Sequence, residues 1–401
     1  MIDIIGNKCT GCSTCTHVCP FKAITMNEEN NGFFYPTINL EKCRKCKKCY
    51  NECPQNNPVI RKKPIKVYAA FCKNKIDYFS GSSGGVFGGL AKEVLDKNGV
   101  VFGCYMDDDF IVKHIEIRKM EDLKKIKKSK YVQSYIGESF FKVKEYLDNN
   151  ILVLFTGTPC QIAGLKKYLK IEYDNLITVD VLCHGVPSNK IFKDFIYYYE
   201  KKHHCRIKKY DFRFKDEKLG SYITYIETSK NKKCYYPWQG LSYSYLFMKD
   251  YILRECCYDC QYVDIKRVSD ITLGDYWNIE KKNSTFSNKL GVSMILLNTS
   301  KGIKLFNKIK SNYEIMETSC EDAVKSNPTL HKKNKKPNDR ELLIKKYKEN
   351  GYIELEKYYK KNCKKSNYYK FVLMSKRIFS KKVYNFLVKV KKRGSKWRKL
   401  K

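Results

Sequence analysis

A run of four closely spaced cysteines stands near the start of this chain and is repeated in full shortly afterwards. The first run is Cys9, Cys12, Cys15 and Cys19 followed by Pro20, and the second is Cys43, Cys46, Cys49 and Cys53 followed by Pro54. Both have the spacing C-x2-C-x2-C-x3-C-P. In this pattern three thiolates surround one loop and bind one iron–sulfur cluster, while the fourth reaches across to a second cluster. The chain is therefore predicted to bind two 4Fe-4S clusters.

The crossover of the fourth cysteine sets the expected ligands of each cluster. One cluster is predicted on Cys9, Cys12, Cys15 and Cys53, and the other on Cys43, Cys46, Cys49 and Cys19. Zinc also accepts four thiolates, but zinc ribbons normally use two separated C-x2-C pairs and need no closing proline. We therefore expect a bacterial-type two-cluster ferredoxin fold over residues 1–60, which conducts electrons and has no place for an organic substrate.

The remaining length must fold into something else, because 401 residues are too many for a ferredoxin. A hydrophobic content of 43% is enough for a globular body. The prolines and basic residues of 58–64 indicate a linker. We expect an α+β protein in which the ferredoxin fold is followed by an α/β flavin-binding catalytic domain and a basic helical C-terminal tail. The expected segments are 1–60, 66–180 and 181–330 (the two parts of the catalytic domain), and 331–401.

Apolar runs that end in small residues mark strands of the α/β domain. Residues 67–72 predict a strand, followed by the Gly/Ser loop 80–89 and a helix around 90–95. The runs 151–155 and 177–182 predict two more buried strands. The turns after such strands lie where open α/β sheets bind their ligands. Glycine in the 80–89 loop would let backbone amides approach a phosphate, although a flexible turn explains the loop equally simply.

Further cysteines stand at these strand ends and in one later pair. Cys160 and Cys183 each follow a predicted strand, and Cys256-Cys257-Tyr258-Asp259-Cys260 contains a C-x2-C pair. Two single cysteines and one pair supply four thiolates, enough for a third 4Fe-4S cluster. Taken singly, Cys160 or Cys183 could equally be a buried apolar thiol.

Several segments together resemble a known family, the beta subunits of coenzyme F420 hydrogenases and dehydrogenases, which are flavin and iron–sulfur proteins. The resemblance covers roughly residues 1–300. It is carried, in the family's order, by residues 80–85, 128–134, 156–164, 180–188, 213–220, 257–260 and 269–277.

The resemblance implies an FAD and the third cluster. The residues implied for FAD are Ser82, Ser83, Gly84, Gly85, Lys130, Tyr131, Gly157 and Thr158, and those implied for the cluster are Cys160, Cys183, Cys257 and Cys260. Cys256 stands where the family tends to have another residue. The chain also departs from the family after Arg213 and Lys215, because Gly220 is followed by Ser221 and not by Trp. The substrate implied is therefore coenzyme F420 or another small acceptor, and similar chains occur in settings connected with surface polysaccharide.

Three residues are candidates for catalysis. His184 adjoins Cys183 and could donate a proton, because histidine titrates near neutrality. Asp270 and Asp275 could orient the flavin or act as acids, and a structural role explains each of the three equally well. We expect an oxidoreductase that passes electrons between a ferredoxin-like carrier and a small molecule. The alternatives are a non-enzymatic electron-transfer protein that docks a catalytic partner and a disulfide reductase that uses the extra thiol of Cys256.

The net charge of +37 is concentrated at the C-terminus, where residues 331–401 hold 26 Lys and Arg against 5 Asp and Glu. Specific nucleic-acid binding is not expected, because no recognition motif accompanies this charge.

No apolar run is long enough to span a bilayer, no signal peptide precedes Cys9, and the closely grouped cysteines suit a reducing, anoxic compartment. We expect a cytoplasmic protein of an anaerobe. Residues 371–388 interleave apolar residues and lysines, which predicts either a packed helical extension or a peripheral contact with the inner membrane face.

Overall fold

The computed structural model describes residues 2–286 and 288–363, so the predicted membrane-contacting segment 371–388 lies outside the described residues. Its N-terminal module contains the 3-10 helix η1 (Ile2–Lys8), helices α1 (Thr14–His17) and α2 (Lys48–Asn51), and an antiparallel hairpin of β1 (Ile24–Glu28) and β2 (Phe34–Ile38). In each cysteine run the short helix follows a residue with positive φ, Ser13 at 63° and Lys47 at 59°. The two runs therefore fold alike, as their repeated spacing predicts.

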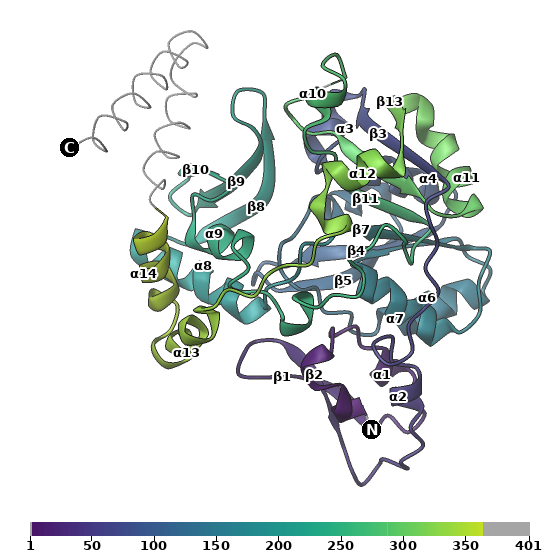
Figure 1. Cartoon of the computed structure of the whole chain (residues 1–401), viewed down its shortest axis with the longest axis vertical. Coiled ribbons are helices and arrows are strands. Elements are labelled where there is room, and N and C mark those ends of the chain that lie inside the picture. Colours follow the sequence, from purple (N-terminus) through teal and green to yellow (C-terminus); the bar gives the residue numbers. More distant parts are fainter. Residues whose placement is uncertain (1, 287, 364–401) are drawn as a thin grey trace. The chain divides into compact units, whose positions relative to one another are not determined.

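A mixed sheet of eight strands forms the body that follows the module (Figure 1). Its strands are β3 (Lys66–Cys72), β4 (Val100–Met106), β5 (Val112–Ile117), β6 (Val153–Gly157), β7 (Leu176–Val181), β11 (Ile271–Asp275), β12 (Ser293–Leu297) and β13 (Tyr313–Thr318). Their order across the sheet is β13-β3-β12-β11-β7-β6-β4-β5. The four strands β4, β6, β7 and β11 are parallel, and β5, β12 and β13 are antiparallel to their neighbours. The three predicted strands are present, each displaced by no more than two residues at either end.

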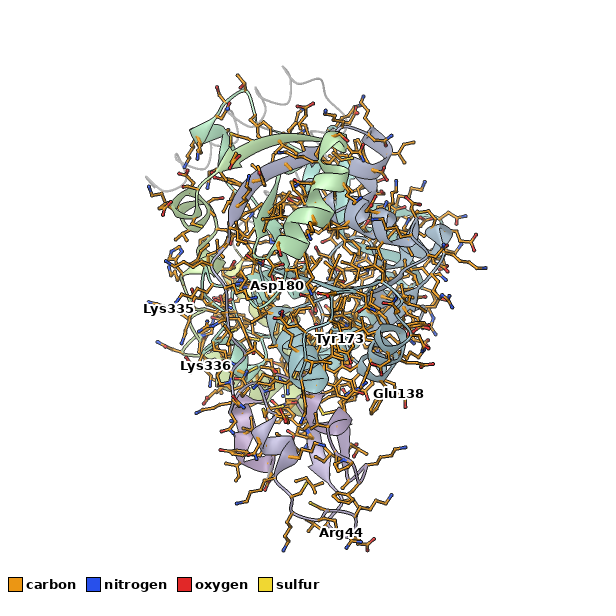
Figure 2. All side chains as sticks on the ribbon, turned by 90° about the vertical axis from the view of Figure 1, so that its right-hand side faces the viewer. Arg44, Glu138, Tyr173, Asp180, Lys335 and Lys336 are labelled. Atoms are coloured by element: carbon orange, nitrogen blue, oxygen red, sulfur yellow. The ribbon has the colours of Figure 1, made fainter. Side chains whose placement is uncertain are left out.

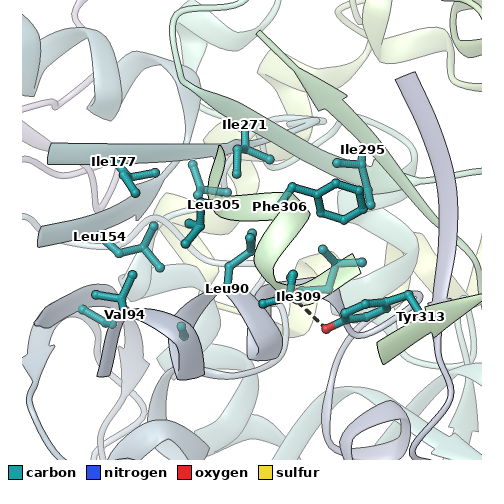
Figure 3. Close-up of a cluster of buried hydrophobic side chains, with 14 of the residues drawn as sticks. Leu90, Val94, Leu154, Ile177, Ile271, Ile295, Leu305, Phe306, Ile309 and Tyr313 are labelled. Carbon is teal, nitrogen blue, oxygen red and sulfur yellow. Dashed lines mark hydrogen bonds between the residues drawn. The ribbon is translucent and has the colours of Figure 1, made fainter. Parts of the chain in front are cut away.

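Helices cover both faces of the sheet because side chains alternate along its strands. Leu154 of β6 packs in the layer with α4 (Val86–Leu95) and α11 (Ser300–Ile309), whereas Phe155 packs in the layer with α6 (Ser139–Asp148) and α7 (Pro159–Leu169). Figure 3 shows the first layer, in which Leu90 and Val94 of α4 meet Leu305 and Phe306 of α11. Both layers are apolar, so the sheet is a rigid platform for the loops at its edges.

The shorter elements of this body connect the strands to the helices. They are α3 (Lys75–Ser80), η2 (Met120–Asp122), α5 (Leu123–Ile126), η3 (Glu255–Cys257), α10 (Ile279–Lys282), η4 (Lys310–Asn312), α12 (Cys320–Ser326) and η5 (Pro328–Leu330). No helix in residues 2–286 and 288–363 combines the length and the apolar character needed to cross a bilayer.

A second compact unit begins within the segment expected to be the C-terminal part of the catalytic domain. Of the described residues, 194–251 and 337–363 form it, while 2–193, 252–286 and 288–336 form the first unit. Its elements are the helix α8 (Asn189–His203), which enters from the first unit, the strands β8 (Ile207–Asp216), β9 (Gly220–Thr228) and β10 (Lys233–Pro237), and the helices α9 (Ser242–Met248), α13 (Arg340–Asn350) and α14 (Ile353–Asn362). The expected segment 181–330 is thus divided, because β8, β9 and β10 form their own three-stranded sheet.

Candidate functional site

The first set of predicted cluster cysteines is buried in the N-terminal module, and we call it the inner site. Its members are Cys9, Cys12, Cys15 and Cys53, and the last three are 7–8% exposed. Burial raises the pKa of Cys15 well above its ordinary value, and repulsion from Cys12, Cys9 and Cys53 raises it further. Burial likewise raises the pKa of Cys53 to about 12. The mutual effect shows that Cys53, from the second run, lies among the cysteines of the first.

The second predicted set, which we call the outer site, lines a cavity at the surface of the same module. Cys19, Cys43, Cys46 and Cys49 all line it. Cys46 is exposed and the other three are half-buried. The fourth cysteine of each run therefore lies with the first three of the other, which is the crossover that the spacing predicts. The assignment of each ligand stays a prediction.

A second cavity brings together the four cysteines for which a third cluster was expected. Cys160, Cys183, Cys257 and Cys260 line it, together with Cys256. Cys160 lies in the first turn of α7, which follows β6, and Cys183 follows the parallel neighbour β7. Helix α7 begins where it does because Thr158 and Gln161 form a capping box and Pro159 occupies the first turn. This local signal fixes the position of Cys160 at the edge of the sheet.

The chemistry of this set suits a cluster. Burial raises the pKa of Cys160 and of Cys183 well above the ordinary value, and the other thiols of the set add to the effect on Cys183. Burial raises the pKa of Cys260 to about 11. Such thiols become thiolates when a cation replaces their protons, which is how metal binding is coupled to deprotonation. The four side chains therefore fit an iron–sulfur cluster as ligands.

The described residues contain no group of three or more His, Cys, Asp or Glu side chains arranged to hold a single metal ion. A 4Fe-4S cluster makes a different demand, because its four thiolates surround a body of several atoms.

The third set lies beside the inner site. Gly164 of α7 faces Cys12, and a Cβ atom built on this glycine would be 3.2 Å from the Cys12 Sγ atom and 2.6 Å from the Thr14 hydroxyl. Thr10 and Gln55 of the N-terminal module also line the cavity of the third set. Helix α1 accordingly lies next to α7 in Figure 1. The absence of a side chain at Gly164 is what allows the module to approach α7 so closely.

Arg254 joins these two sites and was not anticipated from the sequence. It is fully buried. Its Nε atom donates to the Cys9 carbonyl at 2.8 Å, its Nη1 atom to Gln133 Oε1 at 3.0 Å, and its Nη2 atom to the Phe34 carbonyl at 2.9 Å. The guanidinium also lies over the ring of Tyr35, 4.2 Å from its centroid. None of these partners is a carboxylate, so this cation lies close to the cysteines without a directly bonded acidic counter-ion.

Arg254 also lines the cavity of the third set, together with a second buried arginine, Arg267. Arg267 donates to Asp180 at 3.1 Å, and their side chains are 2% and 0% exposed. This pair fixes the end of β7, three residues before Cys183, to the segment that follows Cys260. No sequence motif marks Arg254. Asp180 lies in one of the segments that carried the resemblance, whereas its partner Arg267 lies outside all of them.

The Gly/Ser loop expected to hold FAD uses much of its hydrogen-bonding capacity within the protein. The Gly84 amide donates to Ser293 Oγ at 2.8 Å and the Gly85 amide to the Ser82 carbonyl at 2.9 Å. Ser83 Oγ donates to the Val292 carbonyl at 2.8 Å. The expectation that the amides of Gly84 and Gly85 cradle a phosphate is therefore not supported, since both already have acceptors. The loop does lie at the carboxyl end of β3, which runs in the same direction as β11.

The other residues implied for FAD lie at the same edge of the sheet. The Ser129 amide donates to Ser82 Oγ at 2.9 Å, which places Lys130 and Tyr131 next to the loop. Lys130 Nζ donates to the Lys127 carbonyl at 2.7 Å. Gly157 ends β6 and Thr158 follows it. Thr158 also lines the cavity of the third set, so the two groups of residues meet there.

A buried histidine, His114, is hydrogen bonded to residues next to this edge of the sheet. His114 Nε2 donates to the Thr156 carbonyl at 2.8 Å, so in the neutral ring Nδ1 accepts from the Ser134 hydroxyl at 2.6 Å. Burial lowers its pKa to about 4, so it is neutral near pH 7.

The three catalytic candidates occupy different places. His184 lines the cavity of the third set, and its carbonyl accepts a hydrogen bond from Asn334. Asp275 is at the carboxyl end of β11, on the same edge. Asp270 precedes β11, at the opposite edge, where its buried carboxylate accepts hydrogen bonds from the Thr178 amide and hydroxyl and from Thr299. A catalytic role for Asp270 is thus disfavoured, because it joins β7 and β11 far from the cysteine cavity.

The two cysteine sets of the N-terminal module, joined to an α/β sheet, define an iron–sulfur electron-transfer protein of the oxidoreductase class. Residues 8–57 match the family model for a 4Fe-4S dicluster domain. Residues 151–323 match the model that describes the C-terminal part of the beta subunits of coenzyme F420 hydrogenases and dehydrogenases. The chain therefore carries the C-terminal domain of that family behind a dicluster ferredoxin domain, and the resemblance seen in the sequence is confirmed.

Individual relatives are distant. The chain is 22% identical to the F subunit of the F420H2 dehydrogenase of Methanosarcina mazei over 77% of its own length and 84% of that protein. It is 26% identical to a coenzyme F420-dependent sulfite reductase of Methanocaldococcus jannaschii, over 75% of its own length and 46% of that protein. A chain of the F420-reducing [NiFe] hydrogenase complex from Methanosarcina barkeri superposes with a TM-score of 0.45 at 16% identity, covering 64% of this chain and 85% of the other.

Proposed function

We propose that this protein is a flavin-containing iron–sulfur oxidoreductase that carries electrons between a one-electron carrier and a small-molecule substrate. One observation carries the proposal: four cysteines from three separate segments line one cavity, and that cavity directly adjoins the inner site of the ferredoxin module. A module that only stored electrons would not need such a junction. The arrangement supports a path from the outer site through the inner site to a third cluster on Cys160, Cys183, Cys257 and Cys260.

The edge of the sheet next to the cavity is the proposed flavin site. Residues 82–85, 129–131 and 157–158 all lie there, and Thr158 belongs to both groups. FAD bound at this edge would supply the conversion of single electrons into a hydride equivalent. The residues of this chain would hold it, with Lys130 as the nearby cation and Ser82 and Tyr131 as polar contacts. The amides of Gly84 and Gly85 contribute by shaping the loop and not by binding.

The substrate is proposed to be coenzyme F420 or another small two-electron acceptor. Two relatives are named for reactions with F420. The departure from the family after Lys215 falls at the start of β9. His184 and Asp275 remain candidates for proton transfer to that substrate. A connection with polysaccharide synthesis stays a prediction from the sequence.

A disulfide reductase is the second candidate, and Cys256 is the observation that favours it. This fifth thiol lines the same cavity, and its interaction with the adjacent Cys257 lowers the pKa of Cys257. Its presence would allow covalent chemistry at the pair 256–257 if no third cluster formed there. The two candidates therefore make opposite demands on the same cysteines.

Iron analysis of two matched variants separates them. The wild-type protein, purified without oxygen, is expected to hold about 12 iron atoms per chain in three clusters and one FAD. Cys257→Ser should reduce the iron to about 8, because one ligand of the third cluster is lost. Cys256→Ser, in the neighbouring position, should leave the iron content unchanged.

The proposal would fail if the wild type held about 8 iron atoms with Cys257 and Cys260 open to alkylation, a result that favours thiol chemistry. A protein with three clusters and no FAD would instead support the non-enzymatic electron-transfer role.

A further inference from the structure

Five cations surround the outer site, and we call them the basic rim: Lys42, Arg44, Lys45, Lys47 and Lys48. The first four are exposed and Lys48 is half-buried. Four of the five, all but Lys42, line the cavity of the outer cysteines. One carboxylate, Glu41, stands in the same stretch of sequence. None of the five cations forms an ion pair with any carboxylate in the described part of the chain.

The outer site is also the part of the module that is accessible from solution. Cys46 is exposed, whereas Cys12, its counterpart in the first run, is 8% exposed. Phe21 is 44% exposed and lines the same cavity, so an apolar side chain stands among the cations. Figure 2 shows Arg44 at the free end of the module, pointing away from the sheet that holds Asp180.

We propose that the basic rim is the docking surface for an acidic one-electron carrier protein, which exchanges electrons with the outer cluster. This inference rests on the proposed function. It assigns the electron carrier a docking site on this protein and an acidic surface of its own. Uncompensated charges of one sign around a redox centre steer an oppositely charged partner and raise its association rate by 10- to 1,000-fold at low salt. Small redox interfaces rely on such steering because they bury little surface. A single electron passes in each encounter, so the carrier is oxidised as the outer cluster is reduced, and no proton or group is transferred.

A charge-reversal variant tests the docking surface in the full-length protein. Lys42→Glu, Arg44→Glu, Lys45→Glu and Lys47→Glu would be combined, and the control would combine Lys208→Glu, Lys209→Glu, Lys230→Glu and Lys232→Glu. The control residues are four exposed lysines of the second compact unit. Both variants change the net charge equally, so only the place of the change differs.

The measurement is the rate at which the oxidised clusters are reduced, followed by stopped-flow absorbance. The donors are a reduced acidic two-cluster bacterial ferredoxin and, separately, the methyl viologen radical cation. With ferredoxin at low salt, the rim variant is expected to react at least tenfold more slowly than the wild type, and the control less than about twofold more slowly. The wild-type rate should fall toward that of the rim variant as salt is added. Methyl viologen should reduce the rim variant at least as fast as the wild type.

Equal slowing of both variants would overturn the proposal, because net charge and not the rim would then set the rate. An unchanged ferredoxin rate in the rim variant would overturn it as well. If the rim variant loses iron, the corresponding four-fold glutamine variant replaces it, and a rate within twofold of the wild type would be contrary to the proposal. Normal iron content and full reduction by methyl viologen would leave the proposed electron path intact. The docking proposal can therefore be wrong while the proposed function still holds.

Discussion

The two cysteine runs share one backbone but have opposite surroundings. The residue before the second cysteine of each run has positive φ, Gly11 at 68° and Lys45 at 53°. The first run fills its intervening positions with small or uncharged residues that are buried, such as Ser13 at 2% exposure and Thr14 at 1%. The second run has Lys47 and Lys48 in the same places. Duplication thus fixed the cluster-binding geometry, and the intervening residues distinguish a face that packs on the sheet from one that meets solvent.

Because of this difference, the inner site of the module faces the sheet domain and the outer site faces solvent. At the inner site, Gly11 approaches Gln133 and Arg254, and Gly164 of α7 approaches Cys12. At the outer site no comparable element of the described chain covers Cys46, which is exposed. In the proposed electron path, the inner site is therefore the one close to the sheet domain, and the outer site is the one open to a soluble partner.

The largest effect is expected when the residue before the second cysteine of the first run is replaced by its counterpart from the second run. In Gly11→Lys, a Cβ atom would lie 2.7 Å from Gln133 Nε2 and 3.1 Å from Arg254 Nη1. The side chain would displace a buried arginine and break its hydrogen bonds, each of which involves a charged group and is worth about 1.5–3 kcal/mol. We expect the inner cluster to be lost and about four fewer iron atoms per chain.

The reverse exchange, Lys45→Gly, is the matched control. Lys45 is exposed and its positive φ suits glycine, so the free energy of unfolding should change by less than about 1 kcal/mol. Anaerobic urea titration and iron analysis of both variants give the answer. Equal losses in the two would show that the faces do not differ as the structure indicates.

Arg254→Met should have the next largest effect, on the reduction potential of the inner cluster. A buried cation stabilises the more negative, reduced state, so its removal lowers the potential. Charges in partly buried surroundings interact by a few kcal/mol. Since about 59 mV corresponds to 1.4 kcal/mol for one electron, we expect a decrease on the order of 50–100 mV. Loss of its hydrogen bonds to Cys9, Phe34 and Gln133 should also cost about 2–4 kcal/mol of stability.

Redox titration followed by electron paramagnetic resonance can resolve this effect. The potential of the outer cluster should change by less than about 20 mV, because screening weakens the interaction at a solvent-exposed site. Arg254→Lys keeps the charge and should restore much of the inner potential while losing part of the stability. Equal shifts at both clusters, or none at the inner cluster, would contradict the assignment of Arg254 to the inner site.

Much of this organisation can be predicted from the sequence, because it depends on short-range patterns. The spacing of the two runs predicts both cluster sets, and the apolar runs 151–155 and 177–182 predict the strands that bring Cys160 and Cys183 to one edge. The resemblance predicted the third cysteine set. The contrast between Thr10-Gly11 and Arg44-Lys45 is also visible in the sequence. The structure was needed to show that the first pair faces the sheet domain and the second faces solvent.

Long-range contacts explain what could not be predicted. Arg254 lies 245 positions from Cys9, whose carbonyl it binds, and no local pattern encodes that pair. The loop glycines suggested phosphate binding, yet Gly84 bonds Ser293, a partner 209 positions away. Asp270 and Asp275 belong to one short motif, but a strand lies between them, so they face opposite edges of the sheet. A motif places residues near one another in sequence without saying which side of the sheet each one reaches.

The smallest expected effect concerns a described ion pair between the residues that directly follow α2 and α7, Glu52 and Lys170, at 2.7 Å. Their side chains are 22% and 50% exposed, so solvent screens the attraction and the coupling should be about 0.2–1 kcal/mol. A double-mutant cycle of Glu52→Gln, Lys170→Met and the double variant measures it, at low salt and again at high salt, where it should vanish. A coupling above about 2 kcal/mol would mean that charge, and not the close approach at Gly11 and Gly164, holds the module to the sheet. The contrast between a packed inner face and a charged outer face would then no longer hold.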